Sequence, residues 1–288
     1  YQLMLGAILG DIVGSRFEFH NIKSKNFDMF TDEVRITDDS VMTLAVAAAL
    51  LNSDTKELRK LLQQNAVFYM RRFGNRCPRA GYGGRFRRWL RDPEMGAYGS
   101  YGNGSAMRVS ACGWAGCTLD EVKALSYDVT CVTHNHPEGL KGAEAVAAAV
   151  FLARSGASKD EIKKYMEKNY YKLDFTLDEI RDEYRFDVSC QGTVPQALEA
   201  FLEANDFDDA IRNAVSIGGD SDTLAAITGA VAEAYFGLPA FFRQQVYEYV
   251  MEADRYYHTD GILTSTALQF ERAYYLRVFR PQEVFGGF

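Results

Sequence analysis

Residues 218–236 read GGDSDTLAAITGAVAEAYF, in which two glycines and a short acidic string precede a run of small apolar residues. The run from Leu224 to Phe236 has helical spacing and lacks the alternation typical of strands. Because glycine permits a tight backbone turn, the carboxylates of Asp220 and Asp222 are expected to point inward where the helix begins. This stretch therefore predicts a buried helix with acidic groups at its start.

Helical spacing recurs along most of the chain. The other segments that show it are 41–51, 58–70, 106–115, 119–132, 140–153, 194–202 and 211–215. Acids follow Thr118, Ser158 and Asp206 in positions typical of the first turn of a helix. Short runs at 1–5 and 170–175 resemble strands, but they are too isolated to build a sheet. The sequence therefore predicts an all-α fold.

Small residues and the lack of linkers indicate the domain organisation. Helices rich in alanine, such as 45–49 and 143–149, let backbones approach closely and favour a compact multi-helix bundle. No fixed repeat and no Pro- or Ser-rich linker divides the sequence, so we expect one domain over residues 1–288. The stretch 74–101 holds six glycines and two prolines and overlaps an arginine cluster at 71–91. We expect it to be a long functional loop.

Charge and composition exclude several classes of protein. A formal charge of −7 and a pI near 5.3 give no general attraction for nucleic acid or an anionic membrane. No apolar run is long enough to span a membrane, and no secretory signal pattern is present, so we expect a cytoplasmic protein. We also expect a monomer. The five cysteines include no C-x-x-C pair, which favours reduced thiols over disulfides or structural zinc.

A second acidic string, Thr37-Asp38-Asp39-Ser40, opens another alanine-rich helix. Carboxylates and hydroxyls are hard oxygen ligands, so the two strings together would bind magnesium or manganese rather than zinc. If their four aspartates meet, the repulsion calls for dications to offset it. The alternative is that Asp38 or Asp39 only caps the helix that begins near Val41.

Three further segments are candidates for the site. Glu18 follows Asp11 by two helical turns and would share its face if that helix continues, or it pairs with Arg16 at the surface. The glycine-rich junction 98–107 precedes an apolar helix and suits phosphate, or is a structural turn. In residues 133–138, His134 could hydrogen-bond a ligand, and Asn135 or His136 could cap the helix that follows.

Five motifs, taken in order, resemble those of the ADP-ribosylglycohydrolase family, which includes the dinitrogenase-reductase-activating glycohydrolases. They are GDIVGSRFE (10–18), ITDDS (36–40), GSYGNGSAMR (99–108), THNHPEG (133–139) and GGDSDT (218–223). The resemblance runs from Gly6 to Gly237 and implies an all-α orthogonal bundle around a two-metal site. That fold agrees with the one expected from the periodicity.

The resemblance also implies roles for individual residues. The ligands of two Mg²⁺ or Mn²⁺ ions would be Thr37, Asp38, Asp39, Asp220, Asp222 and Thr223. The site for the diphosphate and ribose would be lined by Gly99, Ser100, Tyr101, Gly102 and Asn103, and His134 would contact the distal ribose. Glu18 falls on the catalytic or gating glutamate, and it is our first choice for proton transfer ahead of Asp38 and Asp39.

The implied reaction is metal-dependent hydrolysis that releases ADP-ribose from a modified protein side chain. Family members act on arginine-linked, serine-linked or O-acetylated ADP-ribose, and the segment GYGGRFRRWL (81–90) is more similar to the bacterial arginine-directed members. We therefore expect an ADP-ribosylarginine substrate, with Tyr82 and Trp89 as candidates to stack on adenine or to shape the entrance. The alternatives are a non-catalytic ADP-ribose-binding protein and another metal-dependent phosphohydrolase.

Overall fold

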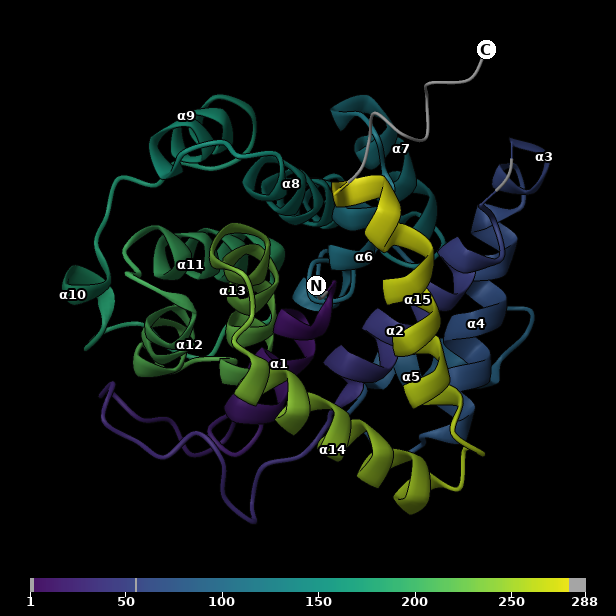
Figure 1. The fold of residues 1–288 in the computed structure, drawn as a ribbon, viewed down its shortest axis with the longest axis horizontal. Helices are drawn as coiled ribbons and strands as arrows, with labels where there is room; N and C mark the ends of the chain where they lie inside the picture. The colour runs from purple at the N-terminus through teal and green to yellow at the C-terminus, as the bar shows by residue number, and fades with distance from the viewer. Residues whose placement is uncertain (1–2, 55, 280–288) are drawn as a thin grey trace.

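The computed structural model describes residues 3–54 and 56–279, and these residues form helices joined by loops (Figure 1). The helices are α1 (Leu5–Gly14), α2 (Asp38–Leu51), α3 (Lys56–Arg59), α4 (Leu62–Arg76), α5 (Gly84–Arg91), η1 (Asn103–Ser105), α6 (Ser110–Ala115), α7 (Leu119–Thr130), α8 (Pro137–Arg154), α9 (Lys159–Asn169), α10 (Leu177–Ile180), α11 (Cys190–Leu202), α12 (Phe207–Ser216), α13 (Ser221–Phe236), α14 (Ala240–Tyr257) and α15 (Ile262–Phe279). Within the described ranges the β pairing consists of one isolated bridge, between Gly102 and Ser189. The all-α prediction is confirmed.

Two helices from distant parts of the sequence, α1 and α13, pack together in the centre of the molecule (Figure 1). Every residue of α1 is buried, because its residues are apolar or small apart from one aspartate. Its glycines recur every four residues, and a Cβ at Gly6, Gly10 or Gly14 would lie 2.3, 1.9 or 2.5 Å from backbone atoms of α13. The two backbones are therefore in direct contact along one face.

The order of these contacts shows that α1 and α13 run antiparallel. Gly6 meets Gly229, whereas Gly14 meets Asp222 at the start of α13. Glu233 then accepts hydrogen bonds from the backbone nitrogens of Leu5 and Gly6, at 3.3 and 2.8 Å. One carboxylate of α13 thus satisfies the first amides of α1, which would otherwise be buried without partners.

The remaining helices cover this central pair. Figure 1 shows α11 and α12 on one side of α13, with α2, α4 and α15 on the other side of α1. Helix α8 packs on α13 and α11, and its buried residues are mostly small, among them Gly142, Ala145 and Ala149. The small side chains let several helices approach the centre, as the alanine-rich segments predict.

Most helix boundaries agree with the sequence signals. Thr118, Ser158 and Asp206 each accept a hydrogen bond from a first-turn amide, so these predicted starts are confirmed. The predicted helix 58–70 is interrupted between α3 and α4, and 106–115 is helical only from Ser110. Helices α14 and α15 lie outside the segments predicted from spacing.

The stretch 74–101 is only partly the loop that we expected. It contains the end of α4 and all of α5, whose Phe86, Trp89 and Leu90 are buried. Because these apolar residues recur at helical spacing, α5 packs against α4 while its arginines face outward. The expectation failed because the glycines that flank this short helix mask its amphipathic pattern.

Two expectations from composition can also be compared with the structure. The five cysteines are all free thiols, and Cys77, Cys112 and Cys190 are buried, as expected for reduced residues in a core. Among the described residues, no helix combines the length and apolar character required to cross a bilayer.

The contact between α1 and α13 leads to a prediction for Gly10→Ala. The new methyl group would lie 1.9 Å from the carbonyl oxygen of Ala225, so the two backbones must separate. We expect a loss of about 3 kcal/mol or more in the free energy of unfolding, measured by urea denaturation. Gly96→Ala is the control, because a Cβ there meets nothing within 4 Å. Equal stability of the two variants would contradict the proposed role of the close contact.

Candidate functional site

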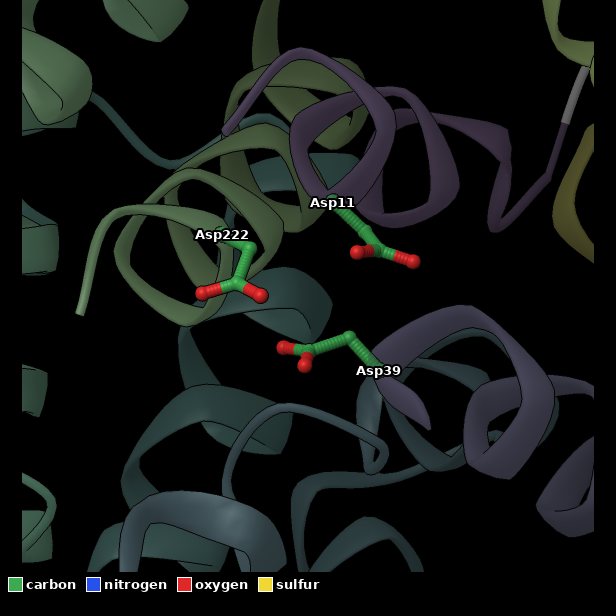
Figure 2. Close-up of side chains that lie close together, drawn as sticks. All are labelled: Asp11, Asp39 and Asp222. Atoms are coloured by element: carbon green, nitrogen blue, oxygen red, sulfur yellow. The ribbon is translucent and has the colours of Figure 1, made fainter. Parts of the chain in front are cut away.

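Three aspartates from three helices point toward one another at the end of the central helix pair (Figure 2). Asp11 comes from α1, Asp39 from α2 and Asp222 from α13, and their nearest carboxylate oxygens lie within 4.8 Å of one another. A second such group comprises Glu18, Asp220 and Asp222. The two acidic strings identified in the sequence therefore meet in the fold, and Asp222 belongs to both groups.

Asp11 fixes the start of α2. Its carboxylate accepts hydrogen bonds from the backbone nitrogens of Thr37 and Ser40 at 2.9 and 3.1 Å, and from both hydroxyls. The helix begins at Asp38 with Thr37 as its cap. The alternative that Asp38 or Asp39 is the helix cap is therefore wrong, and both aspartates lie in the first turn.

The start of α13 is fixed by a glycine turn that Asn21 holds in place. Gly218 and Gly219 have φ angles of 71° and 78°, which confirms the tight turn expected from the two glycines. Asn21 holds this turn, because its side chain accepts from the nitrogen of Gly219 at 2.8 Å and donates to the carbonyl of Gly219 at 2.9 Å. Asp220 occupies the cap position without making a capping hydrogen bond, so its carboxylate is available to the site.

Glu18 reaches the acidic groups by a route that the sequence did not predict. Helix α1 ends at Gly14, so Glu18 does not share a helix face with Asp11. It lies instead in the turn that follows, where the side chain of Asn21 donates to the carbonyls of Phe17 and Glu18 at 2.6 and 3.1 Å. Asn21 therefore joins the turn that carries Glu18 to the turn before α13.

Burial and mutual repulsion raise the pKa values of the acidic residues. Burial, and then the charge of Asp11, raise the pKa of Asp38 to about 8. Burial followed by the charges of Asp220 and Asp11 raises the pKa of Glu18 to about 7. The pKa values of Asp39 and Asp222 are also raised, first by burial and then by neighbouring carboxylates. Charge in this site is therefore unfavourable unless a cation compensates for it.

The donor set fits a divalent cation. The side chains that converge offer oxygen atoms, which suit Mg²⁺ or Mn²⁺. One of them, Oδ1 of Asp39, is buried and has no hydrogen-bond partner in the described part of the chain. A buried carboxylate oxygen that has no hydrogen-bond partner and lies beside other carboxylates is suited to coordinate a metal ion.

These groups form one end of a cavity of about 330 Å³. The predicted site residues that line it are Glu18, Asp38, Asp39, Ser100, Gly102, Asn103, His134, Asp220, Asp222 and Thr223. Three predicted residues are absent from the lining formed by the described chain, namely Thr37, Gly99 and Tyr101. The hydroxyl of Thr37 donates to Asp11 at 2.6 Å, and Tyr101 faces outward with half of its surface exposed.

The glycine-rich segment forms the wall between the acidic end and the rest of the cavity. Asn103 donates to Oδ2 of Asp220 at 2.7 Å, so it contacts the acidic string directly. Ser100 accepts from the nitrogen of Gly102 at 3.2 Å, while Gly99 has a φ of 64° and donates to Asn135. The wall is therefore held by its own turn and by its neighbours, and it places an amide close to the carboxylates.

His134 lies on the same wall and is buried. Its Nδ1 is 2.7 Å from the hydroxyl of Thr133, which accepts a hydrogen bond from Arg108 at 2.7 Å. The other acceptor within reach of that hydroxyl, the carbonyl of Thr130, is farther away at 3.5 Å. We therefore assign the hydroxyl proton to Nδ1, which places the imidazole proton on Nε2.

Two observations favour Nε2 of His134 as a hydrogen-bond donor to a ligand. Nε2 is 3.5 Å from the position that a Cβ at Gly104 would occupy, so the missing side chain leaves it uncovered toward the cavity. The pKa of His134 is well below its usual value because of burial and then the charges of Arg108 and Arg85. A neutral imidazole with a fixed donor is suited to bind a hydroxyl or phosphate oxygen.

The aromatic residues proposed to stack on adenine are in a different place. Tyr82 and Trp89 are 2% and 1% exposed, and Trp89 stacks on Phe86 with ring centroids 5.4 Å apart. That interpretation is therefore wrong for both residues, because their rings are already covered by protein. Phe86 and Tyr98 line the cavity instead.

Sequence reasoning missed three residues that position the site. They are Asp11, Asn21 and Arg108, and each acts through hydrogen bonds to residues distant in sequence. Asp11 carried a local signal, since it stands between Gly10 and Gly14 in a helix that is otherwise apolar. Arg108 is fully buried, its Nε has no partner within the described residues, and burial lowers its pKa to about 10.

Comparisons with known proteins agree with this geometry. The ADP-ribosylglycohydrolase family matches residues 1–272 of the chain. The ADP-ribosylhydrolase ARH3 of Homo sapiens is 27% identical, with 82% of this chain and 84% of the relative covered. The ADP-ribosylarginine hydrolase Tri1 of Pseudomonas putida is 28% identical, over 82% of this chain and 70% of the relative.

One further relative and one solved structure extend the comparison. The ADP-ribosyl-[dinitrogen reductase] glycohydrolase of Rhodospirillum rubrum is 25% identical over 81% of this chain and 84% of the relative. A solved structure described as an ADP-ribosylglycohydrolase-related protein complex shares the fold with a TM-score of 0.63, at 22% identity over 93% of this chain and 95% of the other. With the family match and the buried acidic site in agreement, the chain belongs to the ADP-ribosylglycohydrolase family and is an ADP-ribosyl glycohydrolase.

Proposed function

We propose that this enzyme uses two divalent cations to hydrolyse the bond between ADP-ribose and a modified arginine side chain of a protein. The observation that carries this proposal is the meeting of the two acidic strings at one end of a cavity whose other walls offer hydrogen-bond donors. A non-catalytic binding protein would have no need for an acidic cluster whose burial is unfavourable without cations.

The residues present suit two Mg²⁺ or Mn²⁺ ions. The proposed ligands are Thr37, Asp38, Asp39, Asp220, Asp222 and Thr223, all from the first turns of α2 and α13 or the positions before them. Such ions would orient the ribose hydroxyls and lower the pKa of a bound water. Asp11 keeps the start of α2 in place through its hydrogen bonds, so we assign it a positioning role rather than a ligand role.

Proton transfer is assigned to Glu18. It is close to Asp220 and Asp222 without being fully buried, so its carboxylate can reach a water held beside the proposed cations. In the proposed reaction the water oxygen bonds to C1″ of the ribose as the bond to the side-chain nitrogen breaks through an oxocarbenium-like state, and Glu18 accepts the proton of the water. The protonated guanidinium group leaves as a neutral guanidine, which then takes up that proton. Asp38 and Asp39 are the alternative bases, and their proposed role in holding cations makes them less available.

The donors of the opposite wall would hold the rest of the substrate. The segment from Gly99 to Asn103 would bind the diphosphate and ribose, and Nε2 of His134 would donate to the distal ribose. The guanidinium of Arg108, buried without a carboxylate partner among the described residues, contributes positive charge to the same part of the cavity. Negative phosphates are therefore favoured away from the acidic end.

The names of two relatives favour an arginine linkage. Tri1 is an ADP-ribosylarginine hydrolase, and the Rhodospirillum rubrum relative is described as acting on ADP-ribosyl-[dinitrogen reductase]. The similarity to ARH3 keeps serine-linked and O-acetylated ADP-ribose as the second candidates, in line with the expectation from the sequence. A cytoplasmic location and a monomeric state remain predictions.

The proposed function predicts release of intact ADP-ribose from an arginine-linked peptide with Mg²⁺ or Mn²⁺, and none with chelator. A matched serine-linked peptide should be cleaved more slowly. The variant with Asp220→Asn and Asp222→Asn should lose activity while it keeps its helical circular dichroism, because two proposed ligands are removed. Full turnover by that variant would rule out the two-metal site, and AMP as the product would indicate a phosphohydrolase instead.

The raised pKa values predict how pH changes stability in the metal-free protein. Asp38 and Glu18 hold protons up to about pH 8 and 7 when folded, whereas the unfolded chain releases them near their ordinary values of 3.8 and 4.5. The folded state therefore binds more protons in this window, and its free energy of unfolding should fall as pH rises from about 4 to 8.

Added Mn²⁺ should reverse part of this loss, by about 2.7 kcal/mol at a hundredfold excess over the dissociation constant. The gain should grow with pH because the proposed ligands bind as carboxylates. Thermal unfolding with chelator or Mn²⁺ between pH 5 and 8 measures both effects, and the double Asn variant should show no metal effect. A metal shift that is the same at every pH would contradict this account.

Glu18→Gln separates chemistry from binding. Glutamine keeps the shape but cannot accept a proton, so we expect kcat to fall by about 10²- to 10⁴-fold while the affinity for ADP-ribose, measured by calorimetry, changes little. Glu33→Gln is the control, because Glu33 has an exposed side chain on a neighbouring segment. If affinity falls as much as turnover, Glu18 is a binding residue.

A further inference from the structure

Two phenylalanines from distant segments form an exposed aromatic pair, of which Phe186 lines the cavity. Phe19 is 76% exposed and Phe186 is 48% exposed. Their rings stack with centroids 6.1 Å apart and an interplanar angle of 25°. Single exposed aromatic residues are common, but a stacked pair brought together by two loops leaves a contiguous apolar surface that calls for an explanation.

The pair lies beside the acidic end of the cavity. Phe19 directly follows Glu18, whose carboxylate is close to those of Asp220 and Asp222. Phe186 itself lines the cavity, together with Val188 from the same segment. The surface is therefore next to the place where the proposed reaction separates ADP-ribose from its protein.

Both segments that carry the pair are fixed by hydrogen bonds. Asn21 ties the turn after Glu18 to Gly219, as described above. On the other segment, the carbonyl of Val188 accepts from the nitrogen of Asn103 at 2.7 Å, and Asp187 accepts from the nitrogen of Ser189. The rings are thus presented from anchored turns, so their relation to the acidic end is a property of the fold.

We propose that Phe19 and Phe186 bind the guanidinium group of the modified arginine as it leaves ADP-ribose. The faces of aromatic rings attract cations, and planar guanidinium groups stack on them well. This inference rests on the proposed arginine linkage and adds the group that would recognise it. Glu18, the residue before Phe19, would supply a carboxylate near the same cation.

The protein already uses this type of contact elsewhere. Arg16 lies 4.4 Å from the ring centroid of Phe17, and Arg85 lies 4.9 Å from that of Tyr98. Neither Phe19 nor Phe186 has such a partner among the described cation–ring contacts, so their outer faces are open to an arginine from another protein. A serine linkage would bring no cation to this surface.

The test compares the substitution of each phenylalanine by leucine and by tyrosine. Leucine keeps the apolar contact and loses the aromatic face, whereas tyrosine keeps both. With an arginine-linked peptide we expect kcat/KM to fall about three- to fivefold for Phe19→Leu or Phe186→Leu, and about tenfold for the double variant. The tyrosine variants should keep kcat/KM within about twofold of wild type. If the rings only filled space, leucine and tyrosine would not differ in this way.

Three controls distinguish recognition of the guanidinium group from other roles of the two phenylalanines. ADP-ribose affinity, measured by calorimetry, should not change in the leucine variants, and a loss there would place the pair in the adenine site and overturn the proposal. Phe241→Leu removes another exposed ring, 60% exposed and absent from the cavity lining, and should have no effect. Any serine-linked turnover should be unaffected, and an equal loss on both peptides would mean general protein contact rather than recognition of a cation.

The outcomes also separate this proposal from the proposed function. If wild-type enzyme cleaves the arginine-linked peptide and the leucine variants are equally fast, the aromatic pair is not a guanidinium site and the proposed function stands. If wild-type enzyme releases no ADP-ribose from the arginine-linked peptide but cleaves the serine-linked one, the arginine linkage is wrong and the guanidinium site fails with it.

Discussion

The backbone contact between α1 and α13 is the constraint on which the rest of the site depends. Three glycines remove the side chains that would separate these helices, and the result places Gly14 against Asp222. Because α1 cannot shift along α13 without a clash, Asp11 is held at a fixed distance from the acidic string of α13. Asp11 then fixes the start of α2 and with it Asp39, so one packing contact propagates to three carboxylates.

The arrangement has a cost that the fold must bear. Burying several carboxylates side by side is unfavourable, and their raised pKa values reflect that cost. The opposing contribution comes from a core in which α1, α2 and α13 are largely apolar and buried. Stability supplied by the core thus maintains a strained electrostatic site, which a pair of cations would relieve.

Local signals in the sequence predicted the helices and the acidic strings, and long-range contacts decided the rest. The turn at Gly218 and Gly219 can be predicted because only glycine adopts that backbone conformation readily. The alanine-rich helices can be predicted from the helical spacing of their apolar residues. The position of Glu18 depends on the hydrogen bonds of Asn21 to a turn far along the chain, which no local pattern encodes. Trp89 shows the same limit, since an aromatic residue next to glycines looks like a ligand contact until packing buries it.

The cavity is lined by groups of opposite charge, and these would orient the proposed substrate. The lining includes the carboxylates of Glu18, Asp38 and Asp220, together with Arg85, Arg108 and His134. With the proposed cations bound by the carboxylates, the ribose hydroxyls would lie at the cations and the phosphates toward Arg85, Arg108 and His134. That orientation directs the modified side chain outward past Glu18, where the turn that carries it meets the segment containing Phe186. The same electrostatic asymmetry that would select the substrate would therefore also determine which part of the surface meets the target protein.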